Sequence, residues 1–168
     1  MKKGDYMMHK TTIKLTYEEY KRFSLAIMKK ALTKSSVGLL ILLLFASILK
    51  GMNNSKIAAF LCVFVMVYVF ILIFKVNSQI KKTYESNELF KGITQTIEFY
   101  EKHFVAKSDK SETTVEYEKL YKVIENKTNF YLMIGDNQGY LVLKENCSKE
   151  LISFIEEVKN KIARKKRG

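Results

Sequence analysis

The chain has 168 residues, a formal net charge of +12, a mean hydropathy of −0.09 and seven scattered glycines. This length fits about one domain of ordinary size. The positive charge is concentrated at the ends, because residues 1–34 carry nine basic and three acidic side chains and residues 161–168 carry five basic and none acidic. Residues 91–160 carry ten basic and twelve acidic side chains, so the charge pattern argues against a nucleic-acid-binding domain.

Residues 1–31 are expected to form a short strand and an interfacial helix. The segment 12–16, TIKLT, alternates in polarity, which predicts a strand. Thr16 and Glu19 have the spacing of a capping box and predict a helix that begins at Thr16. This helix either lies on the cytoplasmic leaflet or extends directly into the first membrane span, and the sequence leaves both alternatives open.

Two apolar runs follow. Residues 57–74, IAAFLCVFVMVYVFILIF, contain 18 residues without a charge, and about 20 apolar residues cross a bilayer. The run at 37–49 is shorter, and it can span only if its helix begins near Leu32. Two core helices of a soluble protein are the alternative, but helices that are apolar all round need lipid or a large protein around them.

We therefore expect a transmembrane hairpin over residues 32–75, with spans at about 32–50 and 57–75. Nine lysines and arginines flank the hairpin on the side of the termini, whereas the connecting loop has only Lys50 and Lys56. By the positive-inside rule, both termini face the cytoplasm. The expected location is a cell membrane, with a multi-pass topology.

Basic side chains near the membrane are the candidate contacts for anionic lipid headgroups, which attract such residues by about 1 kcal/mol each. They are Lys29, Lys30, Lys34, Lys75, Lys81, Lys82, Lys161, Arg164, Lys165, Lys166 and Arg167. For the last five, a solvated tail without a specific role is an equal alternative. Small or polar residues within the spans are candidates for helix–helix packing, namely Gly38, Ala46, Ser47 and Tyr68.

After a helical linker at 76–91, residues 92–163 are expected to form a cytoplasmic domain, followed by a basic tail at 164–168. Period-two segments separated by NKTN and GDNQG predict antiparallel strands in a meander. From Ser148, apolar residues at helical spacing predict an amphipathic helix that covers the sheet. The expected fold class is an α+β membrane protein: a two-helix hairpin plus a small β-meander capped by a C-terminal helix. Whether the N-terminal strand pairs with the distal sheet is left open.

The order of these pieces resembles the YcxB-like family of small bacterial membrane proteins. The features that carry the resemblance are LTYEEYKRF near the start, the closely spaced hairpin, the segment TIEFYEKHFVAKSDKSETTVEYEKLYKVIENKTNFYLMI, and a closing strand before a final helix. The resemblance implies a cytoplasmic domain with a pleckstrin-homology-like (PH-like) fold. It supplies no catalytic residue.

The sequence predicts no catalytic, metal or cofactor site. Its two histidines, His9 and His103, have no neighbours at the spacing of a metal site or a nucleophile pair. We expect a non-enzymatic membrane-anchored module that recognises a protein or anionic lipid at the cytoplasmic face. The alternative is an accessory or regulatory subunit of a transport or resistance complex that contacts its partner through the hairpin. Because two spans form a pore only in an oligomer, a homo-oligomer is also left open, and an enzyme is the weakest alternative.

Overall fold

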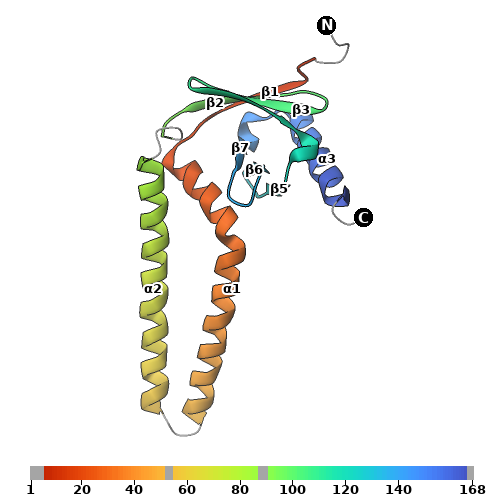
Figure 1. Cartoon of the computed structure of the whole chain (residues 1–168). Helices are drawn as coiled ribbons and strands as arrows, with labels where there is room; N and C mark the ends of the chain where they lie inside the picture. The colour runs from red at the N-terminus through yellow and green to blue at the C-terminus, as the bar shows by residue number, and fades with distance from the viewer. Residues whose placement is uncertain (1–5, 52–54, 87–90, 166–168) are drawn as a thin grey trace. The chain divides into compact units, whose positions relative to one another are not determined.

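The computed structural model describes residues 6–51, 55–86 and 91–165 (Figure 1). The chain divides into two compact units, one of residues 1–23 with 87–168 and one of residues 24–86. The first unit holds every strand of the described chain together with the C-terminal helix, and the second holds most of two long helices.

The strands of the first unit form two antiparallel sheets. The four-stranded sheet has the order β1-β2-β3-β4, with strands His9–Lys14, Thr94–Phe99, His103–Ser108 and Ser111–Glu116. The three-stranded sheet has the order β5-β6-β7, with strands Lys122–Glu125, Asn129–Met133 and Gly139–Leu143. Short 3-10 helices follow β4 and β7, namely η1 (Tyr117–Lys119) and η2 (Lys144–Asn146), and the helix α3 spans Lys149–Lys165. An α+β fold with antiparallel strands and a C-terminal helix is thereby confirmed, but the expected meander is divided into two sheets at η1.

The N-terminal strand belongs to the distal domain. All six residues of β1 are paired with β2, in a register that matches His9 with Phe99 and Lys14 with Thr94. Its alternate residues Thr11 and Ile13 are buried, as the alternating pattern of the sequence predicts. The strand lies about three residues earlier than TIKLT, and its pairing answers the question that the sequence left open.

The two long helices are an insertion between two adjacent strands. The ladder between β1 and β2 continues past the strand ends, because Leu15 N–H donates to the Ile93 carbonyl (2.9 Å) and Gly92 N–H donates to the Leu15 carbonyl (3.1 Å). Gly92 has a backbone φ of +67°, a left-handed conformation that glycine adopts without strain. Both ends of the insertion are therefore hydrogen-bonded into the same sheet.

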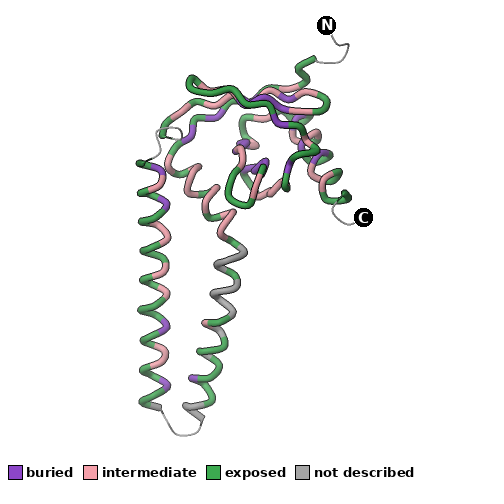
Figure 2. The backbone as a smooth tube through the Cα atoms, viewed as in Figure 1, coloured by how far each residue is buried: buried purple, intermediate pink, exposed green. Residues whose placement is uncertain are grey.

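The inserted helices are α1 (Tyr17–Gly51) and α2 (Ser55–Ser86). From residue 24 onward α1 runs in the opposite direction to α2 (Figure 1). Among the described residues, one helical stretch, Lys56–Ser86, is long and apolar enough to cross a membrane. Most of that stretch is exposed, and Figure 2 shows few buried positions along α2. The helical linker expected at 76–91 is helical as far as Ser86, and residues 87–90 lie outside the described part of the chain.

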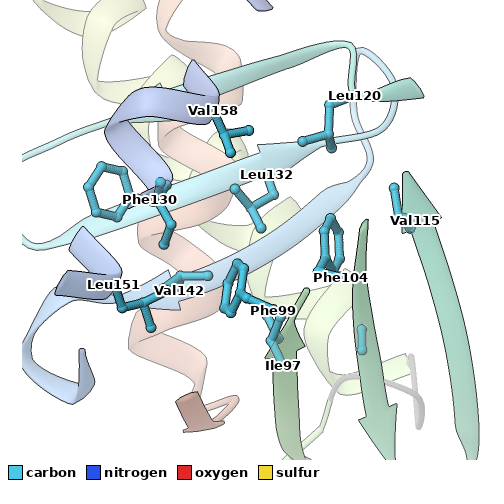
Figure 3. Packing of buried hydrophobic residues seen from close by; sticks show 12 residues of the cluster. Ile97, Phe99, Phe104, Val115, Leu120, Phe130, Leu132, Val142, Leu151 and Val158 are labelled. Carbon is cyan, nitrogen blue, oxygen red and sulfur yellow. The ribbon is translucent and has the colours of Figure 1, made fainter. Parts of the chain in front are cut away.

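The core of the first unit lies between the inner faces of the two sheets and α3. In Figure 3, Phe99 and Phe104 of the four-stranded sheet point toward Leu132 and Val142 of the other sheet. Buried residues of α3 complete the cluster, namely Leu151, Ile155 and Val158. Each of these apolar side chains contributes roughly 1.5–3 kcal/mol when it is fully buried. This packing fixes α3 and with it the groove described next.

Candidate functional site

The first unit holds a groove of about 720 Å³, which we call the α3 groove. It lies between the turn that joins β2 to β3, the 3-10 helix η1, and the second half of α3. Its apolar lining consists of Tyr117, Leu120, Phe154, Val158 and Ile162. Its charged lining consists of Glu101, Lys102, Glu116, Glu118, Glu157, Lys161 and Lys165.

Two aromatic rings of the apolar lining, Tyr117 and Phe154, are held in place by the core. The Tyr117 ring contacts Phe154 edge-on, with ring centroids 5.7 Å apart, and contacts Phe104 at 6.2 Å. The Tyr117 hydroxyl donates a hydrogen bond to the Tyr100 carbonyl (2.9 Å). Burial raises the pKa of Tyr117 well above its ordinary value of 10, so its phenol stays neutral at physiological pH. The neutral phenol keeps its proton for the hydrogen bond to the Tyr100 carbonyl.

The position of α3 is fixed at its start and in its middle. The Ser148 hydroxyl accepts a hydrogen bond from Leu151 N–H (3.2 Å), which caps the helix. Farther along, Lys159 donates to one carboxylate oxygen of Glu125 in β5, and Lys144 donates to the other. These two hydrogen bonds lower the pKa of Glu125, which keeps its carboxylate charged. The helix is thus held to the three-stranded sheet.

The charges around the groove have both signs. Carboxylates come from all three elements, and the lysines come from the β2–β3 turn and from α3. Glu116 is already paired with Lys119, at 3.2 Å between Nζ and Oε1, on the exposed surface. The groove therefore combines an apolar floor with acidic and basic side chains along its margin.

Two of the predicted lipid-contacting residues line this groove, namely Lys161 and Lys165. Arg164 is exposed on the same helix, and Lys166 and Arg167 lie outside the described residues. In the second unit Lys29, Lys75, Lys81 and Lys82 are exposed, and Lys81 lies 3.9 Å from Glu85. The side chains of Lys30 and Lys34 lie outside the described part of the chain. Contact of these residues with lipid stays a prediction.

The candidates for helix packing differ in exposure. Ala46 is buried, whereas Gly38, Ser47 and Tyr68 are exposed. A side chain at Gly38 would have open space around it, because a Cβ placed there meets nothing within 4 Å. Ala58 and Val65 of α2 are buried in the same unit, although the sequence reasoning did not single them out.

Residues 99–158 match the family model described as YcxB-like protein. The predicted resemblance is confirmed for this segment. The YcxB-like segment begins at the end of β2 and ends within α3, so it contains most of the residues that line the α3 groove. Comparison of the chain with curated proteins and with solved structures gave no match.

The YcxB-like segment offers little for metal or nucleophilic chemistry. Over the residues that the structure describes, no group of three or more histidine, cysteine or acidic side chains is arranged to hold a metal ion. Burial raises the pKa of the Cys147 thiol, which disfavours the reactive thiolate. The Cys147 thiol instead donates to the Leu143 carbonyl (3.1 Å).

Sequence reasoning missed the α3 groove as a site. Its residues come from a turn, a 3-10 helix and a helix that are separated by up to some sixty positions in the chain. One signal in the sequence was Tyr117, the aromatic residue of YEKL, which follows a segment of alternating polarity. A tyrosine at the end of a strand often packs its ring against a neighbouring apolar helix.

Proposed function

We propose that this protein is a membrane-anchored, non-enzymatic module of bacterial cells that binds a segment of a partner protein at the cytoplasmic face. The α3 groove is the observation that carries the proposal. An apolar floor with charges of both signs along the margin is suited to side chains of a peptide. Four carboxylates around the groove disfavour the phosphate of a lipid headgroup as its occupant.

The membrane anchor in this proposal is a two-span hairpin with both termini in the cytoplasm. Support comes from α2, which is apolar, long enough to span and mostly exposed. The 35-residue length of α1 allows a second crossing, since about 20 residues suffice. Because both ends of the insertion are bonded into one sheet, the domain stays on one side of the membrane. The exposed lysines next to the helices then hold anionic lipid.

The proposed domain fold is PH-like. A four-stranded and a three-stranded antiparallel sheet, packed face to face and followed by a C-terminal helix, agree with the fold that the family resemblance implies. In this interpretation the hairpin interrupts the domain after its first strand. The domain then comprises residues 9–15 as well as 92–163.

The second candidate function is an accessory subunit that contacts a transport or resistance complex through its hairpin. Tyr68 favours it, because this side chain is 42% exposed in the middle of the apolar run of α2. A tyrosine hydroxyl is costly in hydrocarbon unless it finds a hydrogen-bond partner, and a neighbouring helix could supply one. Gly38 and Ser47 would lie in the same contact.

Photo-crosslinking in living cells tests these alternatives. One crosslinking amino acid replaces Lys161 at the groove, a second replaces Phe64 on α2, and a control replaces Glu156, which is exposed on α3 away from the groove. A defined protein adduct from position 161 that is missing from position 156 supports groove recognition. An adduct only from position 64 supports the accessory-subunit function, and a lipid adduct from position 161 supports lipid recognition instead.

A further inference from the structure

One edge of the four-stranded sheet is open. In the part of the chain that the structure describes, no strand pairs with the outer edge of β4. The opposite edge strand, β1, is covered by η2: Thr11 donates to the Asn146 carbonyl (3.1 Å), and the Asn146 amide donates to the Thr12 carbonyl (2.8 Å). In the other sheet, β5 contacts α3 and β7 contacts β1. An exposed edge of this kind is a template for pairing with another strand.

The register identifies which backbone groups of β4 face outward. In an antiparallel pair, positions that exchange hydrogen bonds alternate with positions that do not. Tyr117 N–H donates to the Lys102 carbonyl (3.0 Å), in the register that pairs β3 with β4. The bonded positions are therefore the odd-numbered ones. Glu112, Thr114 and Glu116 direct their N–H and C=O groups toward the open edge.

The side chains at these three positions also share one face of the sheet, and all are exposed. Two of the three are carboxylates, at positions i and i+4. Glu112 lies 3.7 Å from Lys107, which is half-buried and pairs more closely with Glu98 (2.8 Å). Glu116 lies 3.2 Å from the exposed Lys119. Exposed pairs of this kind contribute little and rearrange readily.

We propose that β4 binds an extended segment of a partner protein that adds to the sheet as a fifth, antiparallel strand. The segment carries lysine or arginine at two positions four residues apart, opposite Glu116 and Glu112. A β-branched residue between them faces Thr114, since such pairs stabilise neighbouring strands. This inference rests on the proposed function and gives the partner segment its chemistry.

The same segment would reach the α3 groove. Glu116 is the last residue of β4 and also lines the groove, and Tyr117 follows on the face that carries Val115. A residue placed just before the first basic residue of the added strand lies opposite Tyr117. An apolar side chain at this position extends into the apolar floor of the groove. The edge and the groove thus form one continuous binding surface.

A second copy of this chain is a poorer occupant. Two β4 strands that pair around Thr114 place Glu112 of each copy opposite Glu116 of the other. Like charges directly opposite one another destabilise a strand pair. The open edge is therefore complementary to a basic segment and not to itself.

The test uses the purified full chain in detergent and the synthetic peptide SLKVTTK, whose leucine, first lysine and second lysine match Tyr117, Glu116 and Glu112. The control peptide SLEVTTE reverses both charges. We expect the lysine peptide to bind about 3- to 30-fold more tightly than the glutamate peptide in fluorescence anisotropy. Added salt should reduce the difference.

Two protein variants locate the binding. Thr114→Pro removes an outward N–H without touching the bonds between β3 and β4, so it should abolish peptide binding, whereas the matched Thr114→Val should keep it. The double variant E112K/E116K keeps the backbone and should reverse the preference between the two peptides. Equal binding of both peptides by the natural protein, or an unchanged preference in E112K/E116K, would overturn the proposal. If either result is found while the crosslinker at position 161 still gives a protein adduct in cells, strand addition is refuted and the proposed function is not.

Discussion

The side-chain amide of Asn129 in β6 donates a hydrogen bond to the carboxylate of Glu19 in the first turn of α1, at 2.9 Å. The same carboxylate accepts a hydrogen bond from Arg22 (2.8 Å), and the Phe23 ring lies 5.5 Å from the Tyr131 ring. The first two turns of this long helix thus belong to the folded domain. Residues 17–23 of α1 are therefore part of the first unit, together with the strands.

We expect Glu19 and Asn129 to be energetically coupled. Asn129 is fully buried, and its Oδ1 has no hydrogen-bond partner among the described residues. The hydrogen bond to Glu19 is therefore one of the few that its side-chain amide forms. Asn129→Ala should lower the free energy of unfolding by about 1–3 kcal/mol, because it leaves the half-buried Glu19 carboxylate with fewer donors. Chemical denaturation of the protein in detergent, followed by circular dichroism, measures this loss.

A double-mutant cycle separates this coupling from general damage. Glu19→Ala combined with Asn129→Ala should show a coupling energy of about 0.5–3 kcal/mol. Glu18→Ala is the matched control, because Glu18 is exposed in the same helical turn. Additive losses in the Glu19 cycle would contradict a coupling between the helix and the domain.

Gly139 is expected to tolerate no side chain. A Cβ at this position would lie 2.7 Å from the Leu132 carbonyl oxygen and 3.0 Å from the Met133 Cα, both in the backbone of β6. Gly139→Ala should therefore destabilise the protein by roughly 1–3 kcal/mol. Gly135→Ala is the control, since a Cβ there meets nothing within 4 Å. If the melting temperatures of the two variants are equal, then β6 and β7 accommodate the added methyl group without loss of stability.

The sequence predicts the elements of this fold better than their assembly. The alternation in β1, the capping residues Thr16 and Ser148, and the stripe of α3 are local patterns, and each predicts its element. The pairing of β1 with β2 is not local, because 79 residues separate Lys14 from Thr94. The polarity pattern of a strand does not indicate which other strand it pairs with. The division into two sheets likewise follows from η1, a single turn that no apolar period marks.

The α3 groove and the open edge of β4 were beyond sequence reasoning for a related reason. Charge alone predicts that Lys161 and Lys165 contact anionic lipid. In the folded domain they line the same groove as Glu101 and Glu118, an arrangement that charge along the chain does not reveal. Charge counts along a chain add residues that are adjacent in sequence, whereas a binding site combines residues that are adjacent in space.

The hydroxyl of Tyr117 is expected to stabilise the domain at neutral pH and to destabilise it in alkali. Tyr117→Phe keeps the ring but removes the hydrogen bond to Tyr100, which should cost about 1 kcal/mol at pH 7. Burial raises the pKa of this tyrosine in the folded state. Its stabilising contribution is therefore complete below the unfolded pKa near 10 and is lost as the pH rises above it. Melting temperatures between pH 8 and 11 should fall more steeply for the natural protein than for Tyr117→Phe, and parallel curves would contradict this.

Acid should weaken the attachment of α3. Hydrogen bonds from Lys144 and Lys159 lower the pKa of Glu125 in the folded protein, and the hydrogen bond from Lys107 does the same for Glu98. A carboxylate with a lowered folded pKa contributes stability that is present above its unfolded value, near 4.5, and that is lost as the pH falls through the folded pKa. Melting temperatures measured from pH 6 downward should therefore begin to fall below about pH 5. Glu125→Gln should start from a lower melting temperature at pH 6 and lose less on acidification, because Gln does not titrate. If Glu125→Gln falls as steeply as the natural protein, the ion pairs between β5, η2 and α3 do not hold the helix to the sheet.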